Sequence, residues 1–296
     1  MNGANRGIDL SAGPPPLSLP AQYLSVMRSS IRLVRRPADG AVAGASGGRQ
    51  WEIDALRGVA IVMMVVYHLL WDLQGLGSYK IDVYHGFWHG WQLATASLFI
   101  GLSGLSQSLR YQSQVQKGQR DYRPFLWRGL SVFSWALVIS IVTYLFDPRF
   151  YIQWGILHLI GFSMLVAYPL LRFRWLNLFL GLALLGIAQL VPVLNLNFTW
   201  FGWLGLDATP RLAFDFFPVI PWMGVALLGV FVGNLLYAGG AVAGASGGAR
   251  RFSLPELGGA FPMRGLRLLG QNSLLIYLLH QLVLIATLAA LGLISL

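Results

Sequence analysis

Residues 49–73 read RQWEIDALRGVAIVMMVVYHLLWDL, an apolar stretch that also carries ionisable side chains. Asp54 and Arg57 lie near its start. His68 lies near its far end, and Asp72 follows one helical turn later. A helix turns about 100° and rises about 1.5 Å per residue, so His68 lies within about 20° of the direction of Arg57 around the helix axis and about 16 Å further along it. The stretch therefore predicts a helix with Arg57 and His68 on one face at different depths, and with Asp72 near enough to hydrogen-bond the imidazole and fix its tautomer.

The composition indicates a polytopic membrane protein. Of the 296 residues, 56% are hydrophobic and 11% are charged, whereas soluble domains average about 25% charged residues. The net charge of +10 would point to nucleic acid in a soluble chain, but the arginines fall in short segments between apolar runs, as the positive-inside rule predicts. We therefore expect the lipid bilayer, and not nucleic acid, as a partner. The chain has no cysteine, which excludes disulfides and cysteine metal ligands.

The first 48 residues differ from the rest of the chain. Residues 1–48 contain PPP, several arginines and a Gly/Ala/Ser run, with no apolar stretch of signal-peptide length. They predict a disordered, non-cleaved cytoplasmic tail. The segment GAVAGASGG occurs at 40–48 and again at 240–248. A flexible linker used twice accounts for this better than a repeated fold does, so we expect a flexible loop at about 238–250.

Seven apolar segments follow, each near the length of about 20 residues that spans hydrocarbon. They lie at about 55–75, 89–109, 126–146, 154–171, 175–195, 216–237 and 272–295. The loops at 110–125, 172–174 and 238–271 are rich in arginine, whereas none of the intervening loops is net positive. This alternation predicts an N-terminus inside and a C-terminus outside. The fold class is therefore an all-α integral membrane domain over 49–296, a bundle of about seven helices that we expect in a bacterial inner or plasma membrane.

Two of these segments carry patterned faces. In the second, small residues recur at helical spacing and predict close packing against another helix. They are Ser97, Gly101, Gly104 and Ser108. In the last, a polar stripe runs along an otherwise apolar span and is too polar to face lipid. It consists of Ser273, Tyr277, His280, Gln281 and Thr287.

All the histidines lie in or beside the apolar segments, and four of the five fall toward the outer half. They are His68, His85, His89, His158 and His280. Ionisable groups at membrane depth are costly and usually face a bundle interior or a wet cavity, which makes them candidate site residues. The alternative is a neutral imidazole bonded to a neighbouring helix. His68 is the better candidate for function because it shares a face with Arg57 and Asp72, whereas His158 and His280 are open to either interpretation.

Four segments carry a resemblance to a known family. The run E-x-D-x-L-R-G-x-A-I, with a histidine following Arg57 in an Arg-x10-His pattern, resembles the opening helix of the transmembrane acyltransferase superfamily. FIGLSGLSQSL at 99–109, WGILHLIG at 154–161 and LGQNSLLIYLLHQ at 269–281 are similar to small membrane proteins with a heparan-alpha-glucosaminide N-acetyltransferase-like catalytic domain. The resemblance covers roughly residues 49–296. Relatives usually carry more helices, so we expect either a reduced core or a homo-oligomer.

The resemblance implies an activity and roles for particular residues. An acyl group, acetyl above all, would pass from cytosolic acetyl-CoA or another acyl-CoA to a hydroxyl or amine of a sugar-type acceptor outside. His68, oriented by Asp72, would be the general base or, as the weaker alternative, a transiently acylated nucleophile. HGFWHG at 85–90 faintly resembles the loop that holds the active histidine in the heparan-type enzymes. For His85, a histidine in an interfacial aromatic belt is the favoured alternative.

Acyl-CoA would also need anion-binding groups on the inner side. Arginine forks suit phosphate, so Arg57 with Asp54, together with Arg110 and Arg128, are the donor-binding candidates. The alternative is a snorkelling ion pair and arginines that only orient the chain. No metal-binding pattern such as H-E-x-x-H is present, and we expect no metal.

Two other classes of function compete with an enzyme. A proton-coupled transporter would use buried histidines and aspartates as a proton relay. A non-catalytic membrane subunit would keep the fold without the chemistry. No inverted repeat is visible to support the transporter, and the reduced number of helices leaves the subunit open.

Overall fold

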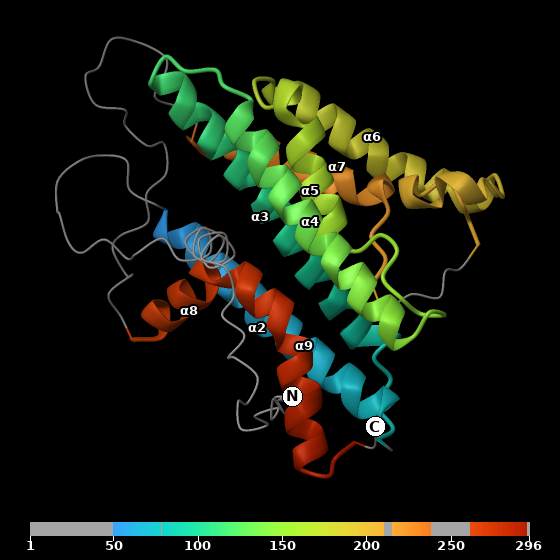
Figure 1. Ribbon diagram of the computed structural model, residues 1–296. Helices are drawn as coiled ribbons and strands as arrows, with labels where there is room; N and C mark the ends of the chain where they lie inside the picture. Colours follow the sequence, from blue (N-terminus) through green and yellow to red (C-terminus); the bar gives the residue numbers. More distant parts are fainter. Residues whose placement is uncertain (1–49, 78, 210–214, 238–260, 295–296) are drawn as a thin grey trace, which may run out of the picture. The chain divides into compact units, whose positions relative to one another are not determined.

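The computed structural model describes residues 50–77, 79–209, 215–237 and 261–294, which belong to one compact unit. These residues form helices joined by turns, and the described ranges contain isolated β-bridges but no β-strand (Figure 1). This confirms the all-α prediction for the described part of the chain. The predicted tail at 1–48 and the predicted flexible loop at 238–250 lie outside the described residues.

The helices follow the apolar segments closely. They are α2 (Trp51–Gly75), α3 (Gly86–Gln116), α4 (Arg123–Phe146), α5 (Ile156–Val166), α6 (Arg174–Val193), α7 (Val219–Tyr237), α8 (Phe261–Gln271) and α9 (Ser273–Ala290), with the short 3-10 turns η1 (Tyr168–Leu170) and η2 (Thr199–Leu204). Helices are the expected form for such segments because lipid offers no hydrogen-bond partner to an unpaired backbone group.

The number of membrane-crossing helices differs from the prediction. Among the described residues, five helices are long and apolar enough to cross a membrane, namely α2, α4, α6, α7 and α9. The segment predicted at 154–171 contains α5, whose 11 residues span only about 17 Å at about 1.5 Å per residue. The segment predicted at 89–109 lies inside α3, which has 31 residues but interleaves glycine, serine and glutamine with its apolar residues.

Two predicted loops turn out to be partly helical. The loop expected at 110–125 begins late because α3 continues to Gln116. The loop expected at 238–271 ends in α8, an amphipathic helix too short and too basic to register as an apolar segment. α8 crosses the start of α2 at backbone contact: a Cβ built on Gly270 would lie 1.7 Å from the carbonyl oxygen of Asp54, and one on Gly58 would lie 2.0 Å from that of Leu266.

The small-residue face of α3 packs against α7, as predicted. A Cβ on Gly104 would lie 1.9 Å from the carbonyl oxygen of Ala226, and one on Gly229 would lie 2.1 Å from that of Gly101. Ser108, at the end of the same face, donates to Asn234 Oδ1 at 2.7 Å. The missing side chains therefore let the two backbones touch, which is how small residues strengthen helix pairs in lipid.

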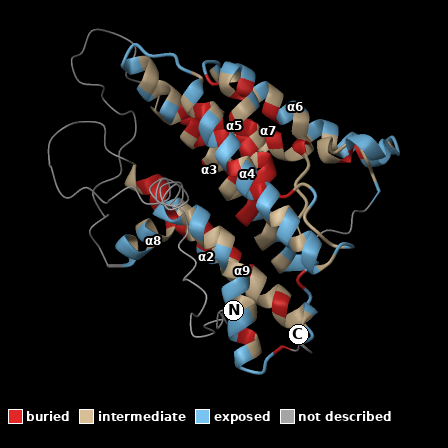
Figure 2. Cartoon of the chain, in the orientation of Figure 1, coloured by how far each residue is buried: buried red, intermediate tan, exposed pale blue. Residues whose placement is uncertain are grey.

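Buried residues lie along α2 and where α3, α5 and α7 meet, whereas α4, α6 and α9 are largely exposed (Figure 2). Large apolar side chains on the outer helices are uncovered, including Leu145 at 78% and Phe146 at 75% exposure. A continuous apolar surface of this kind is not stable in water and is the surface that meets lipid. The protein is therefore an integral membrane protein.

The helix ends beside two of the arginine-rich segments, 110–125 and 172–174, meet in one cluster. Phe125 at the start of α4, Leu171 after α5 and Val230 of α7 pack together. Tyr168 makes edge contacts with the rings of Tyr111 and Phe125 in the same place. The segments 110–125 and 172–174 therefore lie at the same end of the helices, as the charge alternation requires.

Candidate functional site

The two histidines that α2 and α9 carry lie against each other. The ring centroids of His68 and His280 are 4.7 Å apart, edge to face. His68 Nδ1 lies 2.9 Å from the carbonyl oxygen of Met64, and His280 Nδ1 lies 2.7 Å from that of Tyr277. A carbonyl oxygen can only accept, so each Nδ1 carries a proton and each neutral ring presents a bare Nε2. The Nε2 of His280 is buried, with no hydrogen-bond partner among the described residues.

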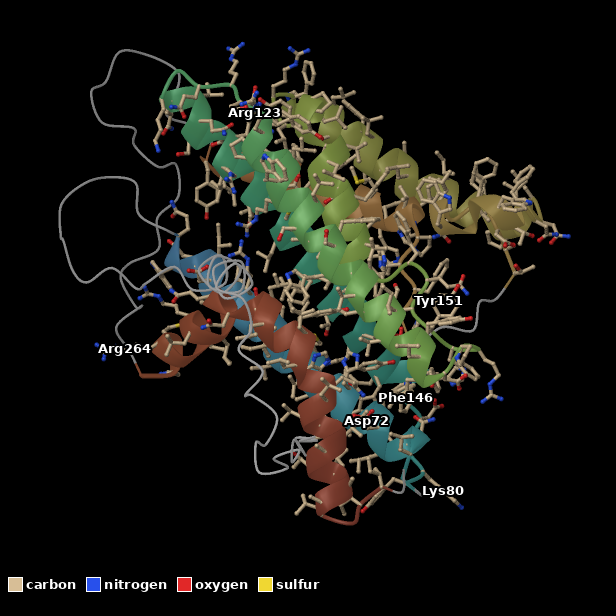
Figure 3. All side chains as sticks on the ribbon, viewed as in Figure 1. Asp72, Lys80, Arg123, Phe146, Tyr151 and Arg264 are labelled. Carbon is tan, nitrogen blue, oxygen red and sulfur yellow. The ribbon has the colours of Figure 1, made fainter. Side chains whose placement is uncertain are left out.

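Asp72 lies in the same region, labelled in Figure 3 on α2 where it runs beside α9. Its side chain is 0% exposed, and its Oδ1 accepts a 2.6 Å hydrogen bond from Gln281 Nε2. Its Oδ2 and the Oε1 of Gln281 are buried and have no partner among the described residues. A buried carboxylate needs such a donor, since burying it without a hydrogen bond is costly.

The predicted hydrogen bond between His68 and Asp72 is therefore wrong. The i, i+4 spacing does bring the two side chains to neighbouring positions on α2, but the carbonyl oxygen of Met64, four residues before His68, lies 2.9 Å from its Nδ1. His68 bonds to its own backbone, and the amide of Gln281 from α9 takes the carboxylate. The tautomer is fixed as predicted, although by a different partner.

This arrangement can accept protons. Two bare imidazole nitrogens, one carboxylate oxygen and one amide oxygen come from two adjoining helices, and no donor among the described residues satisfies the carboxylate oxygen, the amide oxygen or the Nε2 of His280. A positioned imidazole with a free lone pair has the form of a general base. We define the α2–α9 cluster as His68, Asp72, His280 and Gln281.

His158 belongs to a different group of side chains. Its Nδ1 accepts from the backbone N–H of Gly155 at 3.1 Å, and its Nε2 lies 3.3 Å from Ser140 Oγ. The ring stacks on Trp154, with centroids 5.6 Å apart. Both nitrogens have partners, and the side chain holds the first turn of α5. This geometry fits the structural interpretation of His158.

His85 and His89 are exposed at the start of α3. His85 Nδ1 lies 3.0 Å from Asp82 Oδ2, and this hydrogen bond lowers the pKa of the Asp82 carboxyl. The rings of Phe87, Trp88 and Trp91 pack together one turn further along. The acidic partner of His85 precedes it in the sequence by three residues. The arrangement matches the aromatic-belt alternative.

Among the donor-binding candidates, Asp54 and Arg57 come together. Arg57 Nη1 lies 3.1 Å from Asp54 Oδ1, and its Nη2 donates to Ser106 Oγ of α3 at 2.5 Å. Arg110 lies at the end of α3, with its guanidinium 5.6 Å from the centroid of the Phe125 ring. Arg128 is exposed on α4. The structure thus joins α2 to α3 through Arg57. It places Arg110 beside the group of Tyr111, Phe125 and Tyr168, which we call the tyrosine-rich cluster.

Sequence reasoning counted Asp215 only as a loop charge, but it contacts two helices. Its Oδ2 accepts from the backbone N–H of Ile156 at 3.0 Å and from the hydroxyl of Tyr277 at 3.2 Å. Burial raises the pKa of this carboxyl to about 6. No pattern in the sequence joins Asp215 to Tyr277, because the two lie 62 residues apart and meet only through tertiary packing. The described residues contain no group of three acidic or histidine side chains placed to hold a metal ion.

Apolar helices with a partly buried polar cluster where two of them meet define a membrane protein with a polar site among its helices. Residues 49–282 match the family described as Heparan-alpha-glucosaminide N-acetyltransferase, catalytic, and the chain belongs to this family of membrane acyltransferases. The match includes the whole α2–α9 cluster. No curated protein and no solved structure gives a significant match to the chain.

Proposed function

We propose that the protein transfers an acyl group, first of all acetyl, from cytosolic acyl-CoA to a hydroxyl or amine of a glycan-type acceptor on the outer side. The observation that carries the proposal is the His68–His280 pair, which lies beside the buried Asp72 in a chain of an acyltransferase family. Family membership supports the reaction class, and the cluster supplies the proton-accepting group that the reaction needs.

The chemistry assigns His68 the part of general base. Its Nε2 takes the proton of the acceptor hydroxyl or amine while that oxygen or nitrogen attacks the thioester carbonyl. A C–O or C–N bond forms, the C–S bond breaks, and the proton passes to the departing sulfur of coenzyme A. Asp72, one turn away, is the negative charge that stabilises the imidazolium formed in between. Gln281 keeps that carboxylate in place through its amide.

In this proposal, Arg57 binds the phosphates of the acyl-CoA donor. Arg57 and His68 are about 16 Å apart along one face of α2, which suits a donor with anionic phosphates at one end of a long arm and a thioester at the other. Asp54 and Ser106 hold the guanidinium from two sides. Arginine is the side chain that best matches phosphate geometry.

A proton-coupled carrier is the second candidate, and one observation favours it. Asp72 Oδ2 and His280 Nε2 are buried and have no partner among the described residues, as expected for stations of a proton relay. Such a carrier would move protons without breaking a thioester.

The test uses the full chain reconstituted in liposomes that contain a pH-sensitive dye. Acetyl-CoA is supplied on one side, and a panel of amino sugars and neutral sugars on the other. Acyltransfer predicts release of the coenzyme A thiol that depends on the sugar, together with labelled product. Proton flux without thiol release would contradict acyltransfer and favour the proton-coupled carrier. If neither signal appears, the non-catalytic membrane subunit is the interpretation that remains.

A further inference from the structure

One carboxylate oxygen ties three segments together beside the α2–α9 cluster. Asp215 lies just before α7, and its Oδ2 accepts from the first amide of α5, that of Ile156, and from the Tyr277 hydroxyl of α9. A Cβ at position 155 would lie 2.3 Å from this oxygen, so Gly155 leaves the space that the carboxylate occupies.

Asp215 is held firmly on the side of α5 and α7. The backbone N–H of Phe217 donates to the carbonyl oxygen of Trp154 at 2.8 Å, which fixes the segment that carries Asp215 against the residue before Gly155. The N-terminus of α5 also favours a negative or acceptor group at this place, because its first amides have no partner within the helix. Asp215 is therefore a fixed acceptor, and Tyr277 is the donor that reaches it from α9.

Tyr277 connects this acceptor to the cluster. Its carbonyl oxygen accepts from His280 Nδ1 at 2.7 Å, and its ring lies 5.7 Å from the His280 ring. The His280 ring in turn lies 4.7 Å from the His68 ring. Leu288 is the one buried residue in α9, whereas nine residues of α7 are buried. Since few of its side chains are buried, α9 depends on two directed hydrogen bonds for its position: Gln281 to Asp72 of α2, and Tyr277 to Asp215.

We propose that Asp215 is a positioning residue: through Tyr277 it sets the place of His280 against His68. The kinetic part of this inference rests on the proposed acyltransfer, whereas the geometric part does not. Asp215 itself touches neither imidazole. Its oxygen accepts both hydrogen bonds whether the carboxyl is charged or neutral, so an amide oxygen in its place serves as well.

The test compares variants that remove or retain this hydrogen bond. Tyr277→Phe and Asp215→Ala are expected to lower kcat about tenfold, the order of one hydrogen bond's net contribution, with KM for acetyl-CoA unchanged. Asp215→Asn retains most of the activity. Tyr122→Phe is the matched control, since the Tyr122 hydroxyl also joins two helices, by donating to the carbonyl oxygen of Leu165 at 2.8 Å, but at a place with no contact to the cluster.

Two further measurements separate positioning from general stabilisation. In a His280→Ala background, Tyr277→Phe should cause no additional loss of kcat, because the group it acts through is gone. The imidazole ¹⁵N signals of His280, assigned by their loss in His280→Ala, should shift in Tyr277→Phe but not in Tyr122→Phe. Additive losses in the double variant, or unmoved His280 signals in Tyr277→Phe, would overturn the inference. If the wild type transfers no acyl group, the proposed function fails. The imidazole signals still decide whether Tyr277 and Asp215 position His280.

Discussion

Hydrogen bonding within each helix sets the chemistry of the two clustered imidazoles. His68 and His280 each use Nδ1 to donate to a carbonyl oxygen on their own helix, three or four residues back. This directs both basic nitrogens away from their backbones. Asp72 and Gln281 are then paired one turn beyond His68 and one residue beyond His280. The cluster therefore contains one hydrogen bond between the helices and several acceptors that no described residue satisfies.

A kinetic prediction follows for His68 and Arg57. His68→Ala should lower turnover about 100-fold or more, because general bases typically contribute about 10² to 10⁴, and should leave acetyl-CoA affinity near that of the wild type. Arg57→Lys should instead weaken acetyl-CoA binding, because it removes the planar fork and keeps a cation beside the buried Asp54. Turnover and affinity are measured for both variants in one detergent preparation.

The exposed His89 provides the control for that experiment. His89→Ala should match the wild type in both measurements. Wild-type turnover in His68→Ala would remove His68 from the mechanism and transfer the role to His280, the other bare imidazole of the cluster.

At the scale of elements, backbone contact between helices decides where the functional groups lie. The α2–α8 crossing at Gly58 and Gly270 sits beside Asp54 and brings Gln271 Nε2 within 3.5 Å of the Asp54 carboxylate. α9 begins two residues after α8 ends and runs along α2 to the cluster. The crossing thus fixes the place on α2 beside which α9 begins.

The glycines of this crossing carry the second prediction. Gly270→Ala should lower the thermal unfolding temperature in detergent and reduce activity, because the new Cβ meets a backbone carbonyl that cannot give way. Gly265→Ala, in the same helix with open space around it, is the matched control and should be neutral or slightly stabilising. Both are compared by thermal unfolding and turnover. Equal behaviour of the two variants would mean that α8 does not pack on α2 at this contact.

For the whole molecule, the distribution of apolar surface separates the interior from the lipid-facing side. α2, α3, α5 and α7 supply the interior, and α4, α6 and α9 present uncovered leucine, isoleucine and phenylalanine. The tyrosine-rich cluster gathers the basic turns at one end. With the positive-inside rule, that end is predicted to be cytoplasmic, and acyl-CoA is then predicted to enter there.

The orientation is tested with single cysteines in a chain that has none of its own. Ser113 and Thr209 are both exposed and lie on segments predicted to face opposite sides. An impermeant thiol reagent on intact cells should label Thr209→Cys and should label Ser113→Cys only after the membrane is opened. Labelling in the reverse pattern would invert the direction proposed for the transfer.

The sequence by itself determined the membrane class, the family, the positions of the apolar helices and the small-residue seam of α3. These features depend on composition and on the spacing of residues within one helix, and both can be read directly from the sequence. It also identified His68, Asp72 and His280 as separate candidates. Their roles, like the orientation and the acceptor, remain predictions.

Only the tertiary structure decided which of those groups meet. Asp72 bonds to Gln281 of another helix and not to His68, whose Nδ1 donates to the carbonyl oxygen of Met64. The contact of Asp215 with Tyr277 depends on three segments converging. α8 is amphipathic and short, so the sequence did not predict it as a helix. The structure shows that it packs across Gly58 of α2. Contacts between helices depend on how backbones cross, and no spacing within a single helix contains that information.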